Sequence, residues 1–339
     1  MSVANIKNNV PHPPTKNNGE ASGLGMSGTT NNNKNNTPRP RTKNKGDWKE
    51  KLTPFLFISP HMLFFIIFLA YPTLYGFYIS FNSWNFFTDM QFVGLQNYAN
   101  ILWNSDSLYF DYFWSAFRAT LIFTVLSVPF LVIIPLFLAI GINARPFGHN
   151  FFRALFYAPS LLSVVTVVLI WIWLLDTNAG LVNYYLQTLG LDNIPWLTRA
   201  PWVWISLVMM TIWWTIGTNM ILFLAGLGEI ADHLYEAAKI DGANKIQQFF
   251  HVTLPGLKGP MAFVVIMTTL ASFNVMAQPQ LATGGGPGYE TRVLILYIYE
   301  VGFTGGNPRA GLAAAMSVVL GMILLSISLI QFKLMSKEK

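Results

Sequence analysis

The sequence predicts an all-α, polytopic membrane protein with six transmembrane helices, and three observations support this prediction. Of the 339 residues, 53% are apolar and 15% aromatic, which exceeds the composition of an ordinary soluble domain. The apolar residues gather in six runs without Asp, Glu, Lys or Arg. Each run reaches the roughly 20 residues that a helix needs to cross about 30 Å of hydrocarbon, and the runs are continuously apolar, whereas barrel strands alternate.

Hydrophilic segments that carry the charged residues separate the six runs. Pro72, Pro129 and Pro135 lie inside runs, where a neighbouring helix or water is expected to bond the carbonyl that each proline leaves without a donor. These prolines therefore predict kinks rather than helix ends. In chain order, the predicted spans are 55–82, 119–143, 154–175, 200–228, 259–289 and 310–331.

The first 50 residues differ from the rest of the chain. They are rich in Asn, Lys, Thr, Pro and Gly and contain almost no large apolar side chains, so they cannot bury enough surface to offset the entropy of ordering. The sequence therefore predicts a disordered cytoplasmic tail over residues 1–50 and a membrane domain over residues 51–339. The tail lacks the pattern of a cleaved signal peptide, and the first span is expected to direct insertion.

The basic residues predict the orientation of the chain in the membrane. Seventeen of the 21 Lys and Arg residues lie in the tail, the 145–153 link, the hydrophilic stretch 234–260 and the C-terminal end. The positive-inside rule then places both termini, the link and the stretch in the cytoplasm. The net charge of +6 is explained by this topology, and no nucleic-acid partner is predicted.

The sequence shows no catalytic motif and no metal-ligand spacing. It has no Cys, its five His residues show no ligand spacing, and it lacks the Gly-rich Lys-Ser/Thr motif that cradles nucleotide phosphates. We expect no enzymatic activity, no metal and no cofactor on this chain. The Gly-rich run 283–288 is interpreted as a tight turn. Of the buried ionisable residues that ion-driven carriers use, the runs contain only His61, which lies near the inner end of the first run.

The stretch 234–260 has the pattern of two short helices joined by a sharp turn. Leu234, Ala237, Ala238 and Asp241 share one face of the first helix, and Gly242 permits the turn. A second helix follows, which we expect to end at Leu254 and Pro255. Pattern alone leaves two possibilities open, a docking surface for another protein and an amphipathic loop that lies on lipid.

The spacing in this stretch resembles the EAA loop in the permease subunits of binding-protein-dependent ABC importers. That pattern is E-A-A, three residues, G, nine residues and I-x-L-P. Here it reads Glu236-Ala237-Ala238, Gly242, and Val252 to Pro255, with Val in place of Ile. Ala231 stands where relatives often have Pro. Segments 55–85, 92–102, 151–183 and 282–288 are also similar to the carbohydrate-uptake branch, and the TGGGPG run is similar to the maltose-type first permease.

The resemblance implies the type I fold of ABC importer permeases, with a coupling loop at about 229–259. It implies a chain that moves a mono- to oligosaccharide or related polyol across the cytoplasmic membrane of a bacterium or archaeon by alternating access. The implied partners are a second, homologous permease, two cytoplasmic ATPase subunits that hold ATP and Mg, and an extracytoplasmic sugar-binding protein. The residues implied to couple with the ATPase are Glu236, Ala237, Ala238, Asp241, Gly242, Leu254 and Pro255.

Polar residues inside two spans predict the substrate pathway. Asn274 and Gln278 are four residues apart, as are Thr215 and Asn219, so each pair is expected to share a helical face. Gln280 lies close to the outer end of the fifth run. Amides buried in lipid are costly, so a watery cavity between helices is favoured, although bonds between helices would also explain them. Nearby Trp213, Trp214 and Phe273 suit the apolar faces of a sugar.

Two functions other than import are alternatives for such a chain. A membrane scaffold or sensor could dock an ATPase without transporting anything, and an ion-driven carrier could use the same six spans. Substrate uptake by a reconstituted complex separates the first from an importer, and the missing buried charges weigh against the second. The sequence does not identify the sugar, because substrate specificity in such systems is determined largely by the binding protein.

Overall fold

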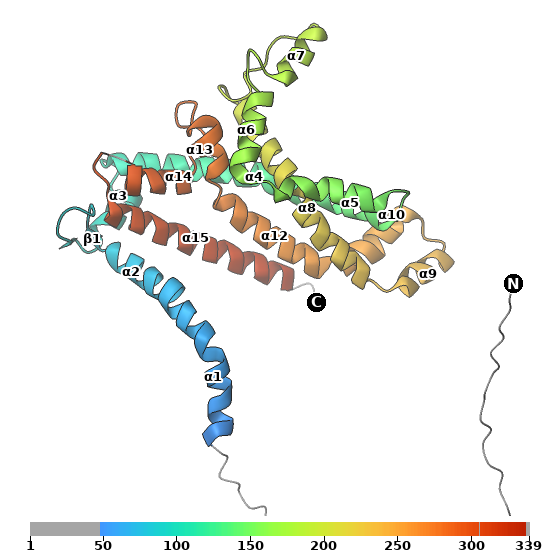
Figure 1. Cartoon of the computed structure of the whole chain (residues 1–339), viewed down its shortest axis with the longest axis horizontal. Coiled ribbons are helices and arrows are strands. Elements are labelled where there is room, and N and C mark those ends of the chain that lie inside the picture. The colour runs from blue at the N-terminus through green and yellow to red at the C-terminus, as the bar shows by residue number, and fades with distance from the viewer. Residues whose placement is uncertain (1–47, 305, 337–339) are drawn as a thin grey trace, which may run out of the picture. The chain divides into compact units, whose positions relative to one another are not determined.

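The computed structural model of the chain describes residues 48–304 and 306–336, and these are almost entirely helical (Figure 1). The chain divides into two units, residues 1–60 and 61–339. Residues 1–47 of the predicted tail lie outside the described residues. Helix α1 (Trp48–Phe65) continues through a π-helical turn, Ile66–Ala70, into α2 (Tyr71–Ile79).

The second unit contains the remaining helices and one small sheet. Strands β1 (Asn82–Ser83) and β2 (Gln91–Phe92) pair antiparallel, with Asn82 opposite Phe92. Three short turns have a tighter or wider helical winding: the 3-10 turn Ala158–Leu161 and the π-helical turns Phe249–Thr253 and Glu300–Thr304. The other helices are α3 (Gln96–Leu102), α4 (Leu108–Asn143), α5 (His149–Tyr157), α6 (Val164–Leu174), α7 (Leu181–Thr188), α8 (Trp202–Glu229), α9 (Asp232–Ile240), α10 (Lys245–Gln248), α11 (Leu254–Gly256), α12 (Lys258–Phe273), α13 (Ala277–Thr283), α14 (Leu294–Tyr299) and α15 (Ala310–Ser336).

Four helical stretches of the described chain are long and apolar enough to cross a membrane. Two further pairs of helices meet the same test together but bend sharply, by 99° at residues 161–164 and by 70° at residues 256–258. Counting each bent pair as one span gives six, the number that the sequence predicts, but the second pair includes Lys245–Gly256, which the sequence predicts to lie outside the fifth span. The four unbent stretches are Thr53–Ile79, Leu108–Asn143, Trp202–Glu229 and Ala310–Met335.

The third predicted span, 154–175, is not one helix. Pro159 lies in the 3-10 turn after α5, and Leu162 is extended. Ser163 then starts α6 as its N-cap, because its Oγ accepts a hydrogen bond of 3.2 Å from the N–H of Thr166. The apolar run hides this break, since both the proline and the capping serine are compatible with a long hydrophobic stretch.

The fifth predicted span, 259–289, also contains a break. Helix α12 ends at Phe273, and α13 begins only at Ala277. Asn274 caps the end of α12, with its Nδ2 donating to the carbonyl oxygen of Leu270 at 2.7 Å. Such side-chain bonds to the backbone compete with continued helix. The Gly-rich run is a turn, as predicted, because Gly284 and Gly285 both have left-handed backbone conformations after α13.

The prolines of α4 do not end the helix, which agrees with the prediction. Pro135 has no N–H, so the carbonyl of Leu131 lacks its helical donor. Asn219 of α8 supplies that donor instead, with its Nδ2 at 2.8 Å from the oxygen of Leu131. The expectation that a neighbouring helix satisfies the freed carbonyl is thus confirmed at Pro135.

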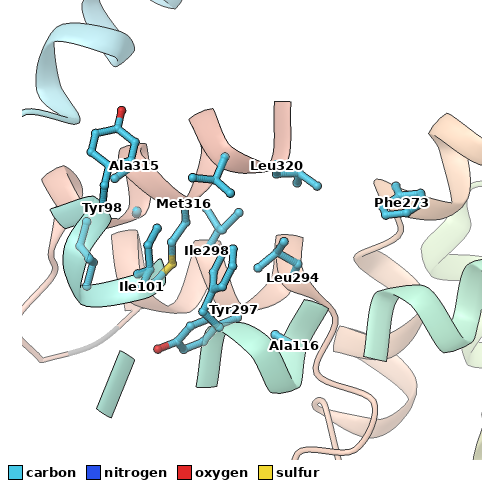
Figure 2. Packing of buried hydrophobic residues seen from close by; sticks show 14 residues of the cluster. Tyr98, Ile101, Ala116, Phe273, Leu294, Tyr297, Ile298, Ala315, Met316 and Leu320 are labelled. Carbon is cyan, nitrogen blue, oxygen red and sulfur yellow. The ribbon is translucent and has the colours of Figure 1, made fainter. Parts of the chain in front are cut away.

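Helix α4 contributes to three buried apolar clusters and forms the centre of the bundle. It packs along α8 and α12, and α15 packs against α12, α14 and α3. Figure 2 shows one cluster, in which Ile101 of α3 and Met316 of α15 face one another beside Ile298 of α14. Ile101 and Met316 are fully buried. This packing joins segments far apart in the sequence and holds in place the helices that carry the candidate functional sites.

Candidate functional site

Helix α9 and the segment α10 to α11, here called the coupling helices, lie together at one end of the bundle (Figure 1). Helix α9 ends in a Schellman motif: the N–H of Gly242 donates to Lys239 at 3.1 Å, and the N–H of Ala243 donates to Ala238 at 2.9 Å. Gly242 has φ +79°, the left-handed conformation that favours glycine. The fixed spacing from Ala238 to Gly242 is therefore the spacing of a helix C-terminal cap.

The second coupling helix starts with a capping box and runs further than predicted. The Asn244 side chain accepts from the N–H of Gln247 at 2.9 Å, and the Gln247 side chain accepts from the N–H of Asn244 at 2.8 Å. We expected Leu254 and Pro255 to end this helix, and it ends one residue later, at Gly256, where the chain bends by 70° into α12. The π-helical turn Phe249–Thr253 precedes Pro255. Its wider winding accommodates the proline, which has no N–H to donate to the helix.

Specific contacts hold the coupling helices together and against the bundle. Tyr235 Oη of α9 lies 3.0 Å from Thr253 Oγ1, which is a hydrogen bond between the two coupling helices. Phe249 stacks on Phe137 of α4, with ring centroids 6.1 Å apart. Leu257, directly after α11, is fully buried. These contacts anchor the pair of helices on α4 and on the buried cluster that contains Leu257.

The surface of the coupling helices combines charge with exposed apolar side chains. Glu236 and Asp241 are exposed, and so are Ala237, Gly242 and Pro255, whereas Ala238 and Leu254 are half-buried. Ile240 is 86% exposed and Ile246 69%. Large apolar side chains exposed on helices that also carry charge mark a contact surface, either for a partner protein or for lipid.

The structure places four of the five predicted pathway residues around one cavity of about 570 Å³. They are Thr215 and Asn219 of α8, Asn274 at the end of α12 and Gln278 of α13. Gln280 is half-buried on α13 and does not line it. Asn274 and Gln278 do not share a helical face, because the break between α12 and α13 separates them, yet both reach the same space.

The polar groups of this cavity are partly engaged in the helices themselves. Asn219 is buried and bonds α4 through Leu131, so one pathway residue also joins two helices. Thr215 Oγ1 donates to the carbonyl of Thr211 at 2.8 Å. Gln278 is also buried at the cavity wall. These four residues therefore combine structural bonds with a polar lining.

Sequence reasoning missed several residues of the cavity. Thr268 and Ser272 of α12 lie four residues apart and line it, and Ser272 Oγ is 3.0 Å from Ser127 Oγ of α4. Their i, i+4 spacing was the available signal, but hydroxyls in membrane helices usually bond their own backbone, as Thr268 does.

One of the three predicted aromatic residues lines the cavity. Trp214 does so and donates from Nε1 to the carbonyl of Leu162 at 3.1 Å. Trp213 instead meets Trp171 edge-on, and Phe273 is buried in the core. Within residues 48–304 and 306–336, no three His, Asp or Glu side chains are grouped as a metal site would require.

Comparison with known families adds to these geometric findings. The family described as "Binding-protein-dependent transport system inner membrane component" matches residues 101–335. The probable ABC transporter permease protein YurN of Bacillus subtilis is 32% identical over 86% of this chain and 98% of its own length. The arabinooligosaccharides transport system permease protein AraP of Halalkalibacterium halodurans is 32% identical over 84% of this chain and 88% of its own.

A further relative and a solved structure cover a similar share. The sn-glycerol-3-phosphate transport system permease protein UgpA of Escherichia coli is 30% identical over 84% of this chain and 95% of its own length. A chain from the crystal structure of a bacterial alginate ABC transporter, in complex with an alginate pentasaccharide-bound periplasmic protein, superposes with a TM-score of 0.72. It is 26% identical and covers 84% of this chain and 94% of its own.

Proposed function

The chain belongs to the family of binding-protein-dependent transport system inner membrane components and is a carbohydrate transport permease, and from this premise we propose that it works in an ATP-driven importer by alternating access. The family and its helices make it a multi-pass membrane protein. A scaffold that transports nothing and an ion-driven carrier do not agree with these relatives, which are named as ABC or transport-system permeases.

The observation that carries the proposal is the preformed pair of coupling helices. Its geometry is set by the Schellman motif at Gly242 and the capping box at Asn244, and its exposed surface includes Ile240 and Ile246. The ATPase of an importer must push on the permease through a rigid surface. The coupling helices fit this role because they contact α4 through Phe249.

The complete importer contains further chains. Two cytoplasmic ATPase subunits bind ATP and Mg, so this permease carries no cofactor and no enzymatic activity of its own. A second, homologous permease completes the pathway as a heterodimer. An extracytoplasmic binding protein delivers the sugar, which agrees with the family description and with the periplasmic protein in the alginate transporter complex.

The cavity between α8, α12 and α13 is the sugar pathway in this proposal. Its hydroxyl and amide groups, from Thr215, Thr218, Asn274 and Gln278, lie beside the ring of Trp214. Sugars present hydroxyls around apolar ring faces, and a cavity with a few polar groups and an aromatic side chain suits both. Mono-, di- and oligosaccharides, related polyols and glycerophosphodiesters all remain compatible with this chemistry.

The chain is oriented with both termini and the coupling helices in the cytoplasm of a bacterial or archaeal cell. The distribution of Lys and Arg supports this orientation. In Figure 1, the coupling helices lie at the opposite end of the bundle from β1 and α3, an arrangement that agrees with this orientation.

The test of the proposal is Gly242→Asp in the purified complex with its ATPase subunits. An aspartate at φ +79° strains the turn and adds a charge where the ATPase docks, so substrate-stimulated ATP hydrolysis and sugar uptake are expected to fall at least tenfold. Membrane insertion is expected to persist. Gly190→Asp is the matched control, because Gly190 has φ +77°, has open space around its Cα and lies after α7.

Wild-type ATP hydrolysis in Gly242→Asp would show that this turn does not couple the permease to an ATPase. Equal losses in Gly242→Asp and Gly190→Asp would also contradict the proposal, because the effect would then come from general destabilisation.

A further inference from the structure

A small polar pocket of about 260 Å³ is lined by residues from β1, α3 and the segment before α15. Strand β1 and helix α3 lie at the end of the bundle opposite the coupling helices (Figure 1). Its wall comes from three segments: the end of β1 and the loop after it, with Ser83 and Thr88; helix α3, with Asn100; and the residues just before α15, with Asn307 and Arg309. The family match covers residues 101–335, so Arg309 lies inside it and Ser83 and Asn100 lie before it, and the family description names no residue of this pocket.

The pocket has a rigid base formed by hydrogen bonds between these segments. Asn97 Nδ2 of α3 donates to the carbonyls of Ser80 at 2.9 Å and Asn82 at 3.0 Å. Asn85 Oδ1 accepts from the N–H of Thr88 at 2.9 Å and from its Oγ1 at 2.7 Å, which fixes the loop. Gly311 of α15 lies so close to Asn82 that a Cβ would overlap the Asn82 carbonyl oxygen. The wall is therefore formed before any ligand arrives.

Hydrogen-bond donors and one cation converge on this space. Arg309 contributes a guanidinium, which also lies over the ring of Tyr109 at 5.0 Å from its centroid. Asn100 and Asn307 contribute amides, and Ser83 contributes a hydroxyl. No acidic residue lines the pocket. A guanidinium with neutral donors around it is complementary to a carboxylate.

The surroundings of the pocket indicate a protein partner rather than a free small acid. Phe87 is 84% exposed and Phe92 77%, and both belong to the same loop and hairpin as the pocket wall. Phe86, beside Phe87 in the loop, is 42% exposed. Exposed aromatic side chains next to an arginine are the composition that protein interfaces favour.

We propose that this pocket receives an Asp or Glu side chain of the extracytoplasmic binding protein when that protein docks on the permease. The proposal rests on the proposed function, which requires such a protein. The Arg309 guanidinium forms the charged hydrogen bond with the carboxylate, and the exposed phenylalanines contact the surface around it. The pocket thus fixes the position of the binding protein at the end opposite the ATPase.

The experiment uses the full transporter in lipid nanodiscs with the binding protein that is co-purified from its host. The dissociation constant of the sugar-loaded binding protein is measured against the wild-type complex and against Arg309→Gln. Loss of a charged hydrogen bond is expected to weaken docking roughly tenfold. It is also expected to make docking less sensitive to salt, which a purely structural change would not do. Arg199→Gln is the matched control, an exposed arginine outside the pocket.

A second variant keeps Arg309 and tests the same site. Ser83→Glu places a carboxylate in the pocket, where it competes with the partner's acid for Arg309, and it is expected to weaken docking as Arg309→Gln does. Wild-type docking in both variants, while the complex still transports, overturns the pocket proposal and leaves the proposed function intact. If the wild-type complex neither binds the binding protein nor responds to its addition, both the pocket proposal and the proposed function are wrong.

Discussion

Asn219 joins two helices through a single carbonyl oxygen. Pro135 leaves Leu131 without its helical donor, and Asn219 Nδ2 fills that place at 2.8 Å while the same residue lines the central cavity. Both interpretations of this amide that the sequence left open are therefore supported by geometry: it bonds a neighbouring helix, and it faces a cavity. The two roles can be separated, because only the first depends on Pro135.

A double-mutant cycle separates these roles. Asn219→Leu leaves the Leu131 oxygen without a donor, and we expect the complex to lose about 1 kcal/mol of stability. In Pro135→Ala, the new N–H of residue 135 can donate to Leu131, so Asn219→Leu is expected to cost less in that background. The thermal midpoint of the detergent-solubilised complex measures this difference.

Gln278→Ala is the control for the pathway role. This residue lines the cavity from α13, and its loss is expected to reduce sugar uptake while the thermal midpoint stays unchanged. An equal loss of stability from Asn219→Leu in both backgrounds would show that the bond to Leu131 contributes nothing. Unchanged uptake in Gln278→Ala would show that the pathway lies elsewhere.

At the scale of elements, the sequence predicted the structures that are encoded locally. The first coupling helix and the turn at Gly242 were correct, because a glycine at that spacing can adopt the left-handed cap of α9. The breaks at Pro159 and Asn274 were missed. An apolar run in the sequence indicates only that the segment is buried in lipid. A broken helix is as apolar as a continuous one when capping side chains form hydrogen bonds with the backbone groups at its ends.

The hydrogen bond between the coupling helices gives an element-scale prediction. Tyr235→Phe removes the bond to Thr253 Oγ1, which contributes about 1 kcal/mol, and loosens α9 relative to the π-helical turn. We expect the complex to assemble but to transport less sugar per ATP hydrolysed. The ratio of uptake to hydrolysis in proteoliposomes measures this.

Tyr184→Phe is the control for that measurement, because Tyr184 lies on α7 and is 60% exposed. It removes the same hydroxyl without touching the coupling helices. A transport ratio that stays at the wild-type value in Tyr235→Phe would mean that the bond between the two helices has no part in coupling.

At the scale of the whole molecule, the two ends of the bundle predict the topology. Reporter fusions at Asn104 and Leu191 are expected to be external, and fusions at His149 and Lys245 internal, because 17 of the 21 basic residues lie on the predicted inner side. Alkaline phosphatase and fluorescent-protein fusions measure the two sides. An external position for Lys245 would place the coupling helices away from any cytoplasmic ATPase.

The central cavity shows what sequence can and cannot give about a site. The sequence pointed to four residues because burying a polar side chain in lipid costs free energy unless it has a hydrogen-bond partner. All four line one cavity: Thr215, Asn219, Asn274 and Gln278. The exclusion of Gln280 and the inclusion of Thr268 and Ser272 depend on how α12 and α13 are broken and rotated. That arrangement is set by tertiary packing and is not visible in spacing along one helix.

The local bonds of the coupling helices also have a consequence for protein engineering. Their turn and caps are formed by residues 238–247 alone, through backbone geometry at Gly242 and the reciprocal bonds of Asn244 and Gln247. Because these local bonds define the shape of the turn, the segment can be moved as a cassette into a related permease, provided that the host offers an aromatic partner like Phe137 for Phe249. Such a chimera would exchange the motor that drives a transporter and leave its cargo unchanged.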